Sequence, residues 1–157
     1  DAQHGHVFSK CLSHGLGTLI RSKGAKTALD LGAGLGHYSA AVDMIGVNVS
    51  CYDGAPNTRG ITAKLCDKLD LSQPNGTGLV PADFVWSLEV GEHVPKDREQ
   101  SFIDNVVRLA TKSVLVSWAV PGQGGHGHVN ERSNKYIIAE FQKRGFKYDA
   151  ASSAKLR

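Results

Sequence analysis

The sequence of 157 residues has no long hydrophobic run and no concentration of charge of one sign. Its most apolar stretch, residues 113–120, falls well short of the about 20 residues that a helix needs to cross a bilayer. We therefore expect a soluble protein that does not enter a membrane. The net charge is +3, and Lys and Arg form neither the cluster nor the stripe that marks a nucleic-acid surface. The length and composition predict a single domain, residues 1–157.

Cysteine is scarce, with three residues: Cys11, Cys51 and Cys66. Their number is odd and no two are spaced as CxxC, so the sequence indicates neither a disulfide framework nor a zinc site with thiolate ligands. Cys51 and Cys66 lie in apolar segments and are interpreted as small buried hydrophobic residues. We therefore expect a reducing, cytoplasmic environment, while the start at Asp1 in place of methionine leaves a removed targeting segment open.

Apolar residues alternate between strand-like runs and helical spacing. Residues 1–23 form a helical segment in which Phe8, Leu12 and Leu16 share a face, and residues 26–157 form an α/β core. We expect helices at 37–45, from about 97, and from a cap at Ser133 or Asn134 to Gly145, and six strands at 27–31, 48–53, within 61–69, 83–90, 113–120 and from 146. This order predicts a doubly wound, mostly parallel sheet, which binds ligands outside the carboxyl ends of its strands.

Glycine is abundant, with 18 residues, and one cluster follows the first strand-like run. Asp30 ends that run, and Gly32, Gly34 and Gly36 form a GxGxG turn that opens a helix. Small residues there let the backbone come close to a ligand that meets the free N–H groups of the helix. A dinucleotide fingerprint needs GxGxxG, so a nicotinamide oxidoreductase is the weaker interpretation, and an ordinary tight turn is the structural alternative.

Asp53 ends the next strand-like run. It follows the glycine turn at close to the offset of about 20 residues at which a carboxylate meets the hydroxyls of a bound ribose. The alternative is turn chemistry, because Asp53 and Gly54 form a good turn pair.

The order of these motifs resembles that of the class I S-adenosylmethionine (SAM)-dependent methyltransferases. Residues 66–74 look like that family's third-strand segment, and residues 83–95 are similar to its fourth motif. The resemblance implies a Rossmann-like methyltransferase fold that binds SAM, in which a usual seventh strand is expected to be missing. It assigns the cofactor to Asp30, Gly32, Gly34, Gly36, Asp53, Asp70, Leu71 and Leu88, with Asp67 as the second choice to Asp70.

Carboxylates and imidazoles come together in the ExxEH segment of Glu89, Glu92 and His93. A second glycine-rich segment contains His126 and His128, and we expect at least one of them to act in the site. Such groups can bind a divalent metal. The resemblance to Hen-type small-RNA 2′-O-methyltransferases and some ubiquinone-pathway O-methyltransferases implies Glu89, Glu92, His93 and His128 as ligands, although the aromatic-rich downstream histidine motif of the Hen type is not recognisable. Alternatively, Glu89 contacts substrate or cofactor, Glu92 caps the next segment and His93 packs.

The resemblance predicts an enzyme that transfers a methyl group from SAM. Glu89, His93 and His128 are the predicted catalytic residues on the acceptor side, because histidine can remove a proton near neutral pH. We expect a small-molecule acceptor that is methylated on oxygen or nitrogen. Two alternatives stay open: a metal-dependent RNA 2′-O-methyltransferase of the Hen type, and a module that binds SAM without transferring its methyl group.

Overall fold

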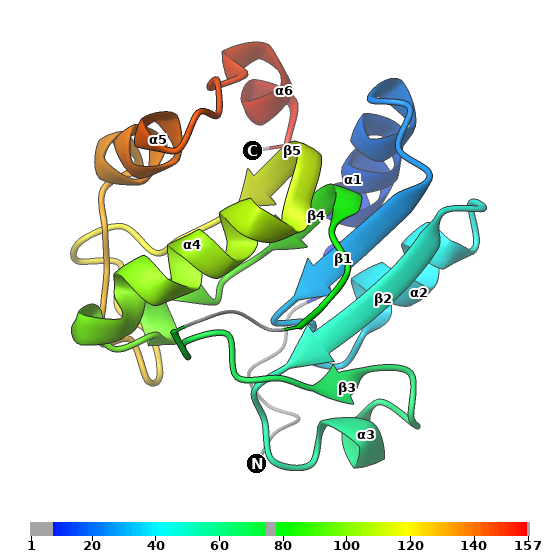
Figure 1. The fold of residues 1–157 in the computed structure, drawn as a ribbon, viewed down its shortest axis with the longest axis horizontal. Helices are drawn as coiled ribbons and strands as arrows, with labels where there is room; N and C mark the ends of the chain where they lie inside the picture. The colour runs from blue at the N-terminus through cyan, green and yellow to red at the C-terminus, as the bar shows by residue number, and fades with distance from the viewer. Residues whose placement is uncertain (1–7, 75–77, 157) are drawn as a thin grey trace.

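The computed structural model describes residues 8–74 and 78–156 (Figure 1), so residues 1–7 of the predicted helical segment lie outside the described residues. The elements in chain order are α1 (Lys10–Ser22), β1 (Thr27–Leu31), α2 (His37–Asp43), β2 (Asn48–Asp53), α3 (Thr58–Ile61), β3 (Asp67–Lys68), β4 (Ala82–Ser87), the 3-10 helices η1 (Gly91–His93) and η2 (Lys96–Arg98), α4 (Glu99–Leu109), β5 (Ala110–Val116), α5 (Asn134–Lys143) and α6 (Ala150–Lys155). Among these described helices, none has both the length and the hydrophobicity that spanning a membrane requires.

The strands form one parallel sheet in the order β3-β2-β1-β4-β5. The chain runs outward from β1 to β2 and β3, and then places β4 on the other side of β1 (Figure 1). The strand order therefore reverses between β1 and β4, and the carboxyl ends of all the strands meet at one edge. Sheets of this kind bind their ligands at that reversal point.

Helices cover both faces of the sheet, because successive strand side chains point to opposite sides. One face of β1 and β4 packs against α1 and α2, and the other packs against α4 and α5. The buried residues include Ala28, Phe84, Leu16, Ile20 and Val42 on the first face, and Leu29, Val85, Phe102, Ile103 and Ile137 on the second. The predicted doubly wound α/β architecture is confirmed.

Local sequence determines where several helices begin. The Ser9 hydroxyl accepts a hydrogen bond from the N–H of Leu12 at the start of α1, and the Ser133 hydroxyl accepts one from Tyr136 at the start of α5. Ser133, rather than Asn134, is therefore the cap of α5.

The strand predicted from residue 146 is wrong. The chain instead forms α6, because the Asp149 carboxylate caps that helix by accepting hydrogen bonds from the N–H (3.0 Å) and hydroxyl (2.7 Å) of Ser152. Within the described residues the sheet thus has five strands, and β5 forms its edge.

Three other strands differ from their predicted bounds, and the first is the strand predicted at 83–90, which runs from Ala82 to Ser87 because the chain turns at Glu89, where φ is +57°. The strand expected within residues 61–69 contains only Asp67 and Lys68, because Ala63 and Lys64 adopt positive φ angles of 49° and 68° and turn the chain before it. The strand predicted at 113–120 begins at Ala110 and ends at Val116, which leaves residues 117–120 free to enter the site.

The cysteine prediction needs correction, because Cys51 and Cys66 form a disulfide. Both residues are buried as expected, and they form a small cluster with Ala33 beneath the glycine turn. The bond joins β2 to the segment before β3, and Cys11 is free and exposed. The inference of a reducing environment rested on unpaired cysteines and therefore loses that basis.

Removing the disulfide is expected to destabilise the fold. The bond joins two residues with a sequence separation of 15. A disulfide that closes a loop of this size stabilises the folded state by about 3 kcal/mol. The double variant Cys51→Ala/Cys66→Ala should lose about that much free energy of unfolding in urea, whereas Cys11→Ala should match the unmodified protein. Dithiothreitol should reproduce the loss in the unmodified protein; an unchanged unfolding curve with dithiothreitol would contradict the prediction.

Candidate functional site

A cavity of about 1250 Å³ lies at the carboxyl ends of the strands. The site residues that line it come from the ends of β1 and β2, from the segments after β3 and β4, and from the glycine-rich loop after β5. They are Asp30, Gly32, Gly34, Asp53, Asp70, Leu71, Leu88, Glu89, Glu92, His93, His126 and His128. The sequence-predicted residues Gly36 and Asp67 are not among the lining residues.

The glycine turn is shaped by close contacts that a side chain would block. Gly32 has a φ of +89°, and a Cβ atom on it would lie 2.2 Å from Cγ2 of Val90. Gly36 begins α2 with a φ of +75° and lies against Leu65 and Cys66. Gly32 therefore keeps the backbone open toward the cavity, and Gly36 seats the turn on the disulfide beneath it.

Asp53 holds the turn in place at the end of β2. Its Oδ2 accepts a hydrogen bond from Gly34 N, and its Oδ1 accepts one from Ala55 N, each at 2.8 Å. Each carboxylate oxygen can accept more than one hydrogen bond. The half-buried Asp53 can therefore still accept from hydroxyl groups in the cavity.

Asp30 is a buried carboxylate at the base of the cavity. Burial raises its pKa to about 7, and the Ser39 hydroxyl, which donates to Oδ2 at 2.7 Å, acts in the opposite direction. A buried carboxylate without a cation is costly in its charged form. A cation bound beside Asp30 would favour that charged form.

Asp70 and Leu71 line another wall of the cavity. Hydrogen bonds from Gln73 and Ser72 lower the pKa of the exposed Asp70 carboxyl, and Leu71 is buried. Asn105 of α4 donates a hydrogen bond to the carbonyl oxygen of Leu71 at 2.7 Å, which fixes this segment. Asp67 instead forms an exposed ion pair with Arg59 at 2.9 Å.

Glu89 leaves β4 in an unusual backbone conformation, with a φ of +57°. The Ser117 hydroxyl holds it there by accepting from Glu89 N (2.8 Å) and donating to Glu89 Oε1 (2.6 Å). Such strain at a non-glycine residue occurs most often at functional sites.

Glu92, His93 and His128 come together along the wall of the cavity. One potential ligand atom from each lies within 4.8 Å of the others. The rings of His93 and His128 meet edge to face at 5.0 Å, and His93 Nδ1 lies 3.2 Å from the carbonyl oxygen of Gly127. Glu89 is not in this group, so three of the four predicted metal ligands are brought together.

Glu92 is fully buried, and neither of its carboxylate oxygens has a hydrogen-bond partner among residues 8–74 and 78–156. Burial and the nearby charge of Glu89 raise its pKa, whereas His93 and His128 act to lower it. Buried charges in proteins are paired or bind metals. This orphaned carboxylate beside two imidazoles fits a divalent cation.

The loop that carries His128 is fastened to the ExxEH segment by its backbone. The carbonyl oxygen of Glu92 accepts hydrogen bonds from the N–H groups of Val129 (2.9 Å) and Asn130 (3.0 Å). The loop also closes on itself, because Arg132 N donates to the carbonyl oxygen of Ala119 at 3.0 Å. His126 is exposed on the same loop and lines the cavity outside the three-residue group.

Glu131 organises the glycine-rich part of this loop. Its carboxylate accepts hydrogen bonds from the N–H groups of Gly122 and Gly124, each at 2.7 Å, and these lower its pKa. His128 Nδ1 lies 3.5 Å from Glu131 Oε1. Glu131 thus connects the first part of the glycine segment to the imidazole of His128.

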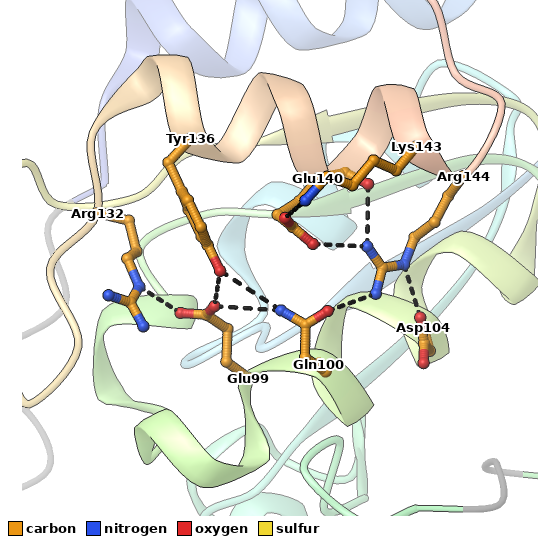
Figure 2. A network of polar contacts seen from close by, with 8 residues as sticks. All are labelled: Glu99, Gln100, Asp104, Arg132, Tyr136, Glu140, Lys143 and Arg144. Carbon is orange, nitrogen blue, oxygen red and sulfur yellow. Dashed lines mark hydrogen bonds and ion pairs between the residues drawn. The ribbon is translucent and has the colours of Figure 1, made fainter.

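Sequence reasoning missed Glu99, a buried carboxylate at the start of α4. It accepts hydrogen bonds from Asn130 (2.8 Å), Arg132 (2.5 Å) and Tyr136 (2.5 Å), as Figure 2 shows for the latter two. Burial acts to raise its pKa, but these donors outweigh burial and hold the pKa below its usual value. Glu99 lay among other charged residues at a predicted helix start, where a solvated side chain is the usual expectation.

The network continues along α4 and α5 through side chains nearer the solvent (Figure 2). Arg144 donates to Asp104 (2.6 Å), to Gln100 (2.7 Å) and to Glu140 (2.9 Å). Together these contacts join α4 to α5. The loop of residues 117–133, which carries His126 and His128 and leads into α5, is called the histidine loop below.

Neutralising Glu99 is expected to destabilise the protein. Glu99→Gln keeps the shape but removes the charge that pairs with Arg132, and losing one partner of a largely buried pair costs about 2–3 kcal/mol. Urea unfolding should show that loss. Asp104→Asn, at the 60% exposed end of the network, should cost at most about 1 kcal/mol. Equal losses in the two variants would contradict the assignment of Glu99 as the anchor.

Comparison with known proteins links this fold to one class of enzymes. No family model and no curated protein matches the sequence. Magnesium protoporphyrin IX methyltransferase from Synechocystis PCC 6803 with bound SAH is 16% identical, with a TM-score of 0.69 over 93% of this chain and 81% of that one. The methyltransferase domain of bacterial CtHen1 is 17% identical, with a TM-score of 0.65 over 86% and 84% of the two chains.

A third solved structure has a fold similar to that of this chain. N-methyltransferase NodS from Bradyrhizobium japonicum WM9, in complex with S-adenosyl-L-homocysteine (SAH), is 14% identical, with a TM-score of 0.67 over 84% of this chain and 71% of that one. At these identities the likeness is one of fold. The chain therefore has the Rossmann-like fold of the class I SAM-dependent methyltransferases.

Proposed function

We propose that this protein is a SAM-dependent methyltransferase formed by a single domain. The observation that carries the proposal is the cavity at the reversal of strand order, where the glycine turn after β1 meets the carboxylate of Asp53 at the end of β2. In doubly wound sheets, a carboxylate at the position of Asp53 binds a ribose ring, and the helix N-terminus after the glycine turn faces the ligand. The fold that this chain shares with solved methyltransferases supports the proposal.

The cofactor contacts follow from the chemistry of each lining residue. Asp53 accepts the ribose hydroxyls, Asp70 and the backbone at Leu71 meet the adenine ring, and Gly32, Gly34 and Leu88 form the walls. Asp30 receives the ammonium group of the methionyl part, because that cation offsets the cost of ionising a buried carboxylate. Gly36 supports the turn from beneath.

The acceptor side contains Glu89, His93 and His128. When bound, SAM would supply an activated methyl group in line with an acceptor oxygen or nitrogen: a lone pair of the acceptor would form the new bond, and the electron pair of the broken C–S bond would go to sulfur, leaving SAH. A histidine removes the proton that the acceptor loses, and Glu89 orients the acceptor. Alignment can supply up to about 7–11 kcal/mol of the barrier reduction.

A divalent metal fits the acceptor side, because Glu92 offers a buried carboxylate with no partner. Glu92, His93 and His128 would hold it. When bound, it would act as a Lewis acid toward an acceptor hydroxyl. This fit, together with the likeness to the CtHen1 domain, supports a second candidate function: a metal-dependent RNA 2′-O-methyltransferase.

Binding of SAH tests the cofactor assignment. Calorimetric titration should show that the protein binds SAH and that Asp53→Asn weakens binding by at least about tenfold, because a hydrogen bond to a charged group contributes about 1.5–3 kcal/mol. Asp43→Asn, exposed at the end of α2, should bind SAH as the unmodified protein does. Absence of SAH binding, or an equal affinity of Asp53→Asn, would refute the assignment.

Transfer of a labelled methyl group from SAM to an acceptor distinguishes an enzyme from a module that only binds SAM.

Titration with Mn²⁺ tests the metal assignment. The unmodified protein should bind about one Mn²⁺, detected by the loss of the free-ion paramagnetic resonance signal, and Glu92→Gln should weaken binding by at least about tenfold because the amide lacks the ligand charge. His14→Ala, on the exposed surface of α1, is the matched control. Mn²⁺ binding that Glu92→Gln leaves unchanged would exclude this site.

A further inference from the structure

The cavity continues past the cofactor residues into an apolar space between the two ends of the chain. Phe8 and Leu12 line it from the start of α1, Ile138 from α5 and Leu156 from the end of α6, and Leu115 forms part of its floor on β5. These side chains come from four different elements. They line the same cavity as Glu89, His93 and His128.

Specific contacts hold α6 over this space. Leu156 packs so closely on α1 that a Cβ atom on Gly15 would lie 2.7 Å from its Cδ2. At the other end of α6, Asp149 forms an ion pair of 2.9 Å with Lys23, the residue that ends α1. Side chains of α1 and of the end of α6 therefore both line the apolar space.

The charged side chains that line the cavity are all of one sign. Carboxylates line it at Asp30, Asp53, Asp70, Glu89 and Glu92, and the described lining residues include neither Lys nor Arg. Recognition of a phosphodiester backbone rests on Lys and Arg contacts to phosphates. The described lining residues thus offer a polyanionic acceptor neither Lys nor Arg.

We propose that the acceptor is an apolar small molecule without phosphate or carboxylate groups, bound between α1 and α6. The inference rests on the proposed methyltransferase function and specifies its substrate class. Small-molecule sites are largely apolar and contain a few placed polar groups. Here the apolar part lies between Phe8, Leu12 and Leu156, and the polar groups are Glu89 and the histidines.

The uncharged dye Nile red provides a probe of this space. Its fluorescence should rise on binding to the SAH-saturated protein, and Leu12→Asp should weaken binding by at least about tenfold, because an ionised carboxylate is costly in an apolar site. Phe8→Asp is a second variant at the exposed start of the chain's described part, in case Leu12→Asp fails to fold. Met44→Asp, which is 86% exposed on the far side of α2, should leave dye binding unchanged.

Single-stranded RNA of about 20 nucleotides, labelled with fluorescein, is the competing probe. It should not bind, and Nile red should stay bound in its presence, because the cavity lacks phosphate-binding cations. Any of three results would overturn the inference. These are no binding of Nile red, equal dye binding by Leu12→Asp, Phe8→Asp and Met44→Asp, and RNA binding that displaces the dye. SAH binding, measured on the same samples, distinguishes failure of the proposed function from failure of the acceptor class. If the unmodified protein does not bind SAH, the methyltransferase proposal is refuted. If it binds SAH and any of these outcomes occurs, only the acceptor class is refuted.

Discussion

The buried carboxylate of Glu99 joins the start of α4 to the end of the histidine loop and to the beginning of α5. It lies at the start of α4 and binds donors from Asn130, Arg132 and Tyr136. These donors belong to the end of the histidine loop and to the beginning of α5. This charge therefore holds the end of the loop against α4, while the backbone hydrogen bonds from Val129 and Asn130 to Glu92 place His128 beside that residue.

The two sides of the cavity are built by different physical means. On the cofactor side, the positions of the turn and of Asp53 follow from the register of β1 and β2, in which backbone hydrogen bonds leave little freedom. On the acceptor side, no strand carries the histidines. They are positioned by the carbonyl oxygen of Glu92 and by the side chains of Glu99 and Glu131.

Much of the fold and of the cofactor side could be predicted from local sequence, because strand runs, caps and the glycine turn have short-range signals. The disulfide between Cys51 and Cys66 could not, since two cysteines in separate apolar segments carry no sign of their proximity. The strand expected from residue 146 failed because the capping carboxylate of Asp149 outweighs a short apolar run. The separation of Glu89 from Glu92 and His93 depends on a positive φ that the ExxEH pattern does not reveal.

The hydrogen bond between Ala119 and Arg132 closes the histidine loop at its base. Because its two ends are joined there, the loop is a self-contained unit, and the cost of changing the length of such a loop grows only slowly with the number of residues. Insertions or exchanges between these two residues need not disturb β5 or α5. In evolutionary terms, this loop can change in length and sequence while the five-stranded sheet and its covering helices stay unaltered.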